Sequence, residues 1–175
     1  MKPFNGALFT LLLVSIAFAG CKKKTESTTD PNGLPKAGQT GAMIFACKIN
    51  GANWISNKSV NSIGGSAASE IVSVHGINDS RNDGFLERLD IQVAGAVAGA
   101  TYKLNDPAAK FATYTTNLGC SVSPGMGQIK SADGEITFTK IDKLHRIISG
   151  VFTCIMLTEK CGQVEITEGR FDISY

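Results

Sequence analysis

The feature that most constrains the fold of this chain is an alternation of apolar and polar side chains with a period of two residues. Because successive side chains of a strand point to opposite faces, such a pattern predicts a strand with one buried face. Glu87 has the parity of the apolar set, so we expect it at the exposed end of its strand. The pattern is clearest in the range 85–94, where Phe85, Leu89, Ile91 and Val93 alternate with Arg88, Asp90 and Gln92.

Similar stretches recur through the body of the chain. Asn50-Gly51 separates two of them, and this pair tolerates the positive φ angles of a two-residue hairpin turn. In the last stretch the apolar parity changes near Glu168-Gly169, which predicts a β-bulge there. Besides 85–94, strands are predicted at 45–49, 53–56, 69–77, 101–104, 111–116, 134–141, 146–156 and 164–175.

These segments define the expected fold class. We predict an all-β domain over residues 42–175, an antiparallel β-sandwich or a flattened barrel of about eight to ten strands. The last three strands should form a meander, and no helix of four or more turns is expected. The 19 glycines and the small charged fraction of 18% suit short strands and turns.

The N-terminus predicts export. Residues 1–20 read as a signal peptide, with Lys2 ahead of an apolar run from Ala7 to Ala19 that is too short to cross a bilayer. The run ends in Phe18-Ala19-Gly20-Cys21, which resembles the lipobox of bacterial lipoproteins. That resemblance implies cleavage before Cys21 and lipidation of its thiol. An ordinary secretory signal that happens to precede a cysteine is the alternative.

Residues 21–41 should form a flexible tether behind the lipidated cysteine, because they are rich in Thr, Ser, Pro and Gly. The partner expected here is the membrane, through the lipid anchor. Without residues 1–20, the 17 basic side chains become 16 against 15 acidic ones, a formal charge of +1. This near balance gives no case for nucleic-acid binding, which needs a concentrated basic face.

Several short motifs resemble a family of small Bacteroidetes-type lipoproteins of unknown function. The segment Phe45 to Trp54 has its NGxxW start, and Ile166 to Tyr175 has its ITxGxFxIxY end. The resemblance implies a compact β-rich envelope domain and supplies no activity. In such lipoproteins surface export goes with acidic residues soon after the cysteine, and here Lys22-Lys23-Lys24 stands there. We therefore expect the periplasmic face of the outer membrane.

Four cysteines remain after Cys21, and an even number in an exported chain suggests disulfides. We expect Cys154 to pair with Cys161, since both lie near facing ends of the last hairpin, which leaves Cys47 for Cys120. Other pairings and four free buried thiols are the alternatives. No CxxC pair occurs, so no metal site is expected.

The sequence carries no motif of a catalytic site or a cofactor, so we predict a domain that is not an enzyme and has no cofactor. His75 and His145 are interpreted as structural. Trp54 and Tyr102 are the candidate ligand contacts, although a lone tryptophan more often packs in a core. The carboxylates that a hydrolase could use are Glu87, Asp90, Asp133, Glu135, Glu165 and Glu168.

The functional prediction is a membrane-anchored lipoprotein of the cell envelope whose β domain serves binding or envelope assembly, with an unknown protein or small-molecule ligand. A lipocalin-like carrier with an apolar cavity is one alternative. A hydrolase acting on envelope glycans or peptides is the other.

Overall fold

The computed structural model describes residues 28–56, 61–79, 87–106, 108–116, 128–158 and 162–175. This part of the chain contains no helix that is long and apolar enough to cross a membrane. Its regular structure consists of strands: β1 Ile44–Ile49, β2 Ala52–Ile55, β3 Ile63–Ser66, β4 Ile71–Asn78, β5 Glu87–Ala94, β6 Thr101–Lys103, β7 Lys110–Thr115, β8 Gln128–Asp142, β9 Ile147–Thr158 and β10 Gly162–Ser174.

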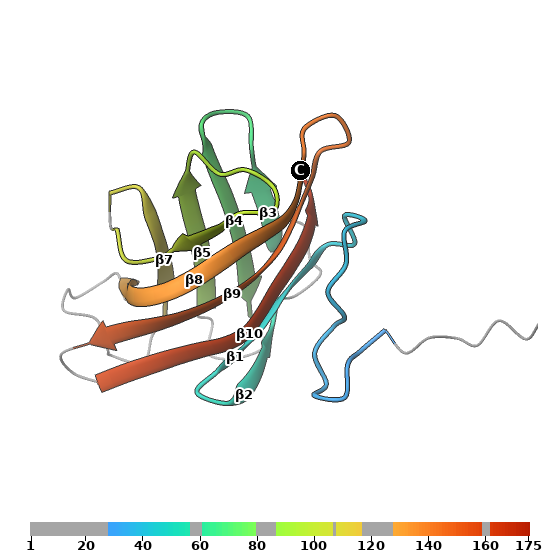
Figure 1. Ribbon diagram of the computed structural model, residues 1–175. Coiled ribbons are helices and arrows are strands. Elements are labelled where there is room, and N and C mark those ends of the chain that lie inside the picture. Colours follow the sequence, from blue (N-terminus) through green and yellow to red (C-terminus); the bar gives the residue numbers. More distant parts are fainter. Residues whose placement is uncertain (1–27, 57–60, 80–86, 107, 117–127, 159–161) are drawn as a thin grey trace, which may run out of the picture.

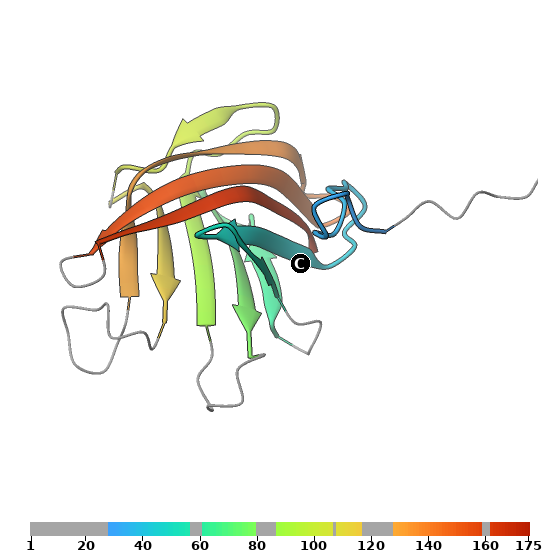
Figure 2. The same cartoon turned by 90° about the horizontal axis from the view of Figure 1, so that it is seen from below.

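All strand pairs are antiparallel, in the order β2-β1-β10-β9-β8-β7-β5-β4-β3. β8 is shared by both halves of the sheet, since Gln128 to Lys130 pair with β7 while its later residues pair with β9 and β6. The sheet therefore curls strongly into a half-barrel, and its two ends approach each other (Figures 1 and 2). The all-β, antiparallel prediction is confirmed.

Local features of the sequence explain several strand boundaries. Asn50 and Gly51 have φ angles of 49° and 80°, as the predicted hairpin turn between β1 and β2 requires. The predicted bulge lies between Ile166 and Gly169 of β10, with Glu168 at a φ of 52°. The meander β8-β9-β10 is also confirmed. β3 was not predicted from the sequence, and β8 begins at Gln128 rather than at the predicted residue 134.

The inner face of the half-barrel is filled by apolar side chains. Four buried phenylalanine rings pack there with centroid separations of 5.5–6.3 Å: Phe45, Phe138, Phe152 and Phe171. The two ends of the sheet are linked by Ser56, which follows β2. Its buried hydroxyl donates a hydrogen bond to the carbonyl of Ile77 at 2.6 Å and accepts one from the Ile77 N–H at 2.9 Å. Ser56 therefore closes the curl where no strand ladder does.

Glu87 does not lie at an exposed strand end, so that prediction is wrong. Its side chain is only 9% exposed, inside the half-barrel at the start of β5. The indole N–H of Trp54 donates to its Oε2 at 2.9 Å, and the hydroxyl of Tyr114 donates to its Oε1 at 3.0 Å. A buried carboxylate is tolerated where donors compensate for its lost hydration, and these two donors come from β2 and β7.

Residues 28–42, here called the strap, lie along the outer face of β10, β1 and β2 (Figure 1). Most of the strap falls inside the range for which the composition predicts a flexible tether. Leu34 is fully buried within it, and the Asp30 side chain accepts hydrogen bonds from the backbone N–H groups of Asn32 and Leu34. Arg170 of β10 pairs with Asp30 at 2.5 Å.

Candidate functional site

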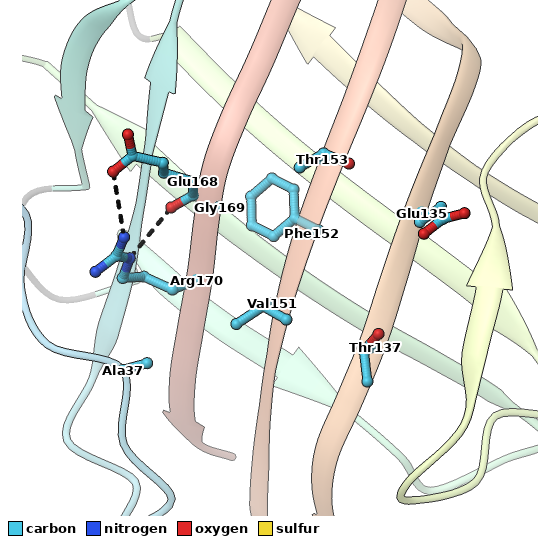
Figure 3. Close-up of a pocket in the computed structure, with 9 residues that line it drawn as sticks. All are labelled: Ala37, Glu135, Thr137, Val151, Phe152, Thr153, Glu168, Gly169 and Arg170. Atoms are coloured by element: carbon cyan, nitrogen blue, oxygen red, sulfur yellow. Dashed lines mark hydrogen bonds and ion pairs between the residues drawn. The ribbon is translucent and has the colours of Figure 1, made fainter.

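A groove runs along the outer face of β8, β9 and β10. It consists of two adjoining depressions of about 400 and 370 Å³, which share Glu135 and Thr153. In Figure 3 the strap residue Ala37 marks one wall of the first depression and Glu135 of β8 the opposite side. We call this surface the outer groove. Its uncharged lining side chains come mostly from outward positions of the strands: Thr137, Val151, Thr153, Ile155 and Thr167.

Both walls of the outer groove carry charged pairs. On the strap side, Glu168 lies 2.5 Å from the ammonium of Lys48 and 3.7 Å from the guanidinium of Arg170. The hydrogen bond from Lys48 is the main reason that the pKa of Glu168 is lowered, so Glu168 stays ionised. On the β8 side, Lys103 lies 2.6 Å from Glu135. The groove therefore offers fixed charges at its rim and small hydroxyl and aliphatic groups between them.

The bulge in β10 shapes the middle of the outer groove. Gly169 sits where a Cβ atom would come within 2.6 Å of the Phe152 ring, so this position has no room for a side chain. Figure 3 shows that ring between β9 and β10, beside Gly169. The bulge also turns Glu168 and Arg170 outward as neighbours on one rim, with Arg170 donating from Nε to the Glu168 carbonyl at 3.1 Å.

Asp172 holds residues 40–42, the C-terminal part of the strap, against β10. It is fully buried, and its carboxylate accepts hydrogen bonds from the backbone N–H groups of Thr40 at 3.0 Å, Gly41 at 2.8 Å and Ala42 at 3.3 Å. The Ser149 hydroxyl donates to it at 2.8 Å. Burial alone would raise the pKa of Asp172, but these donors outweigh burial and lower it.

The candidate carboxylates are divided by the fold. Glu87 is inside the half-barrel, and Asp90 is held by two hydrogen bonds from Arg88, at 2.6 and 2.7 Å. The other four line the outer groove: Asp133, Glu135, Glu165 and Glu168. The sequence gives no reason to place these four carboxylates together. The antiparallel register of β8, β9 and β10 brings them to one surface.

The two candidate aromatic contacts have structural partners. Trp54 is 4% exposed and packs edge-on against Phe45, so it is a core residue. Tyr102 is half-buried beside Phe138, with Lys110 5.7 Å from its ring centre. Its hydroxyl accepts the Val97 N–H at 2.9 Å. Neither aromatic lines the outer groove.

The histidines lie apart from the outer groove. His75 is in β4, opposite Asp90, and its pKa is lowered first by burial and then by the nearby Arg88. His145 is in the β8–β9 turn, where its ring lies 2.8 Å from Asp142. Over the described ranges, no group of three His, Cys, Asp or Glu side chains is arranged to hold a metal ion.

Two of the predicted disulfide cysteines are described, and both are free thiols. Cys47 and Cys154 are buried, and burial raises their pKa values, that of Cys154 to about 12. Cys154 pairs with Ile166, four residues from Thr158 at the end of β9, so it is further from the hairpin end than the disulfide prediction assumed. Cys120, Cys161 and the lipidation candidate Cys21 lie outside the described residues.

The strap was the main element that sequence reasoning missed. Its signal is Pro31-Asn32-Gly33, a turn sequence placed directly before Leu34, the one large aliphatic residue of the segment. A lone leucine does not identify its partner surface, so the docking on β10 is decided by Asp172 and Arg170, which are far away in sequence.

Fold and groove together define a small, all-β antiparallel domain that presents its candidate site on the outside of a curled sheet. The chain belongs to the family described as Domain of unknown function (DUF6252), which it matches over residues 42–172. The matched region begins at the end of the strap. This agrees with the resemblance to a family of unknown function. No curated protein and no solved structure matches the chain.

Proposed function

We propose that this protein is a lipoprotein of the cell envelope, anchored through Cys21 to the periplasmic face of the outer membrane, and that its β domain binds a partner in the outer groove. The observation that carries the binding role is the groove itself, a surface with ion pairs on both rims and hydroxyl and aliphatic groups between them. Recognition surfaces typically combine an apolar floor with a few fixed polar groups.

The packing of the interior supports outer-face binding over the carrier alternative. A carrier needs an apolar lumen, whereas phenylalanine rings from β1, β8, β9 and β10 fill the described inner face. The charges also favour binding over hydrolysis. A glycosidase needs one carboxyl group with a raised pKa, but the pKa of Glu168 is lowered by Lys48.

A crosslinking experiment tests the groove. A photoreactive residue at Val151, 41% exposed in the groove, should yield a discrete crosslinked product in the native host. The matched control is Ile71, an aliphatic residue 47% exposed on β4. Thr153→Arg, which fills the junction of the two depressions, should abolish the Val151 product. The same products from Val151 and Ile71, or a Val151 product that survives Thr153→Arg, would contradict the proposal.

The anchor is tested separately. Mass spectrometry of the mature protein from its host should find acyl groups on Cys21 and no residues before it. Cys21→Ser should move the protein from the detergent phase to the aqueous phase. An unmodified chain that retains residues 1–20, or unchanged partitioning of Cys21→Ser, would overturn the anchor.

A further inference from the structure

Two loops meet at the end of the domain where the β8–β9 hairpin turns. One is the β5–β6 connection, residues 95–100, and the other is the β8–β9 turn, residues 143–146. They line one open depression of about 700 Å³, with Ala96, Val97 and Ala98 on one side and Ile141 and Leu144 on the other. The C-terminus lies beside this hairpin (Figure 1), since the N–H of Tyr175 donates to the carbonyl of Arg146.

Both loops hold a large aliphatic side chain in water. Leu144 is 85% exposed and Val97 is 59% exposed. Backbone hydrogen bonds hold both segments: in the turn that carries Leu144, the His145 N–H donates to Oδ1 of Asp142 at 2.9 Å. The Tyr102 hydroxyl accepts the Val97 N–H, and the Gly99 N–H donates to the carbonyl of Phe138 at 2.7 Å. A pair of aliphatic groups held outward on fixed backbone is preorganised to enter an apolar phase.

Cations surround the two aliphatic groups. Lys143 and Arg146 are exposed in the same turn, and Lys140 lies on the wall of the depression. Asp142 lies 3.5 Å from Lys140, so these two charges offset each other and the net positive charge comes from Lys143 and Arg146. Aliphatic tips among lysine and arginine fit the boundary between acyl chains and anionic headgroups, where each cation adds attraction.

The length of the N-terminal chain allows the anchor and these two loops to contact the same bilayer. Lys140 donates to the carbonyl of Gln39, so the strap touches β8 just before the turn. The N–H of Lys36, which stands three residues before Gln39, donates to the carbonyl of Thr28. From Thr28, the seven residues back to Cys21 span at most about 25 Å. A lipidated Cys21 therefore keeps the strap, including Gln39 where it contacts Lys140, within a short length of chain from the bilayer.

We propose that Val97, Leu144, Lys140, Lys143 and Arg146 form a membrane-contacting tip surface, which inserts its aliphatic side chains into an anionic bilayer and orients the tethered domain on it. The proposal rests on the proposed anchoring at Cys21, which raises the local concentration of the domain at the membrane. Its test omits the lipid, so that failure of one can be told from failure of the other.

The test uses the full mature chain with Cys21→Ser and measures cosedimentation with vesicles of equal parts phosphatidylcholine and phosphatidylglycerol. The double variant Val97→Asp, Leu144→Asp should bind at least about tenfold more weakly, because two aliphatic groups become carboxylates at an anionic surface. Lys143→Glu should weaken binding less, and only to vesicles with phosphatidylglycerol. The matched controls are Leu157→Asp, an exposed leucine on β9, and Lys130→Glu on the other half of the sheet; both should bind as the parent does.

Thermal unfolding of each variant should match that of the parent, since the changed side chains are exposed. Three results would overturn the proposal: no binding of the parent chain to these vesicles, equal losses for the tip and control variants, or a concentration-dependent dimer without vesicles that Leu144→Asp abolishes. The last result would assign the surface to a second copy of the chain. Detection of acylated Cys21 from the host does not depend on any of them.

Discussion

The buried carboxylate of Asp172 allows a quantitative test of the strap. In Asp172→Ala, three backbone N–H groups of the strap, those of Thr40, Gly41 and Ala42, lose their acceptor. A fully buried donor without an acceptor costs about 1–3 kcal/mol, and these donors are only partly buried, so about 3–9 kcal/mol is the upper limit for keeping the strap in place.

Detachment of the strap limits how far the free energy of unfolding can fall in Asp172→Ala. A detached strap regains water for its N–H groups but exposes Leu34, whose burial contributes about 1.5–3 kcal/mol, and separates Asp30 from Arg170. We therefore expect Asp172→Ala to lower the free energy of unfolding by about 2–4 kcal/mol and to free residues 28–42 while β10 stays folded. Asp172→Asn should cost less, because one amide oxygen still accepts.

Urea unfolding gives the global loss, and hydrogen exchange gives the local one. In Asp172→Ala the amide of Gly41 should exchange quickly while amides in the middle of β10 remain protected. The matched control is Glu165→Gln, an exposed carboxylate of the same strand, which should change stability by less than about 0.5 kcal/mol. If Asp172→Ala were as stable as this control and Gly41 stayed protected, the strap would not depend on the carboxylate, and the reasoning would be refuted.

Three further predictions concern other parts of the described fold. Because the pKa of Asp172 is lowered in the folded protein, its contribution to stability is present above the unfolded pKa of about 3.9 and is lost as the pH falls through the folded pKa. Protection of the strap amides, measured by hydrogen exchange, should therefore fall in that acid range and stay constant from pH 5 to 8. Glu87→Ala leaves the Trp54 indole N–H without its acceptor, so it should lower the free energy of unfolding by about 1–3 kcal/mol and change the tryptophan emission, and an unchanged spectrum and urea midpoint would count against the buried cluster. Cys47 and Cys154 should resist alkylation in the native protein and react after unfolding without reductant; mass mapping that finds either in a disulfide would contradict the free thiols.

Where the sequence succeeded, the signal was local. Asn50-Gly51 predicted the β1–β2 turn because few other pairs tolerate two successive positive φ angles. The parity change before Phe171 predicted the β10 bulge because a strand that buries one face cannot change face without an extra residue. Both inferences need only neighbouring residues.

Where the sequence failed, the deciding partner was distant. Glu87 has the parity of a core residue, and the donors of Trp54 and Tyr114, which approach it in the fold, help to compensate for its lost hydration. The β9–β10 register, which places Cys154 opposite Ile166, is likewise specified by no local pattern.

The sequence by itself determined most of the strands, the β1–β2 turn and the β10 bulge, because side-chain alternation and backbone φ preferences act over a few residues. The curl of the sheet, the outer groove and the docking of the strap were decided by the tertiary structure. Arg170 meets Asp30 and Asp172 meets Thr40 across more than 130 residues of chain. Such contacts depend on the arrangement of the strands between them, so no local pattern encodes them.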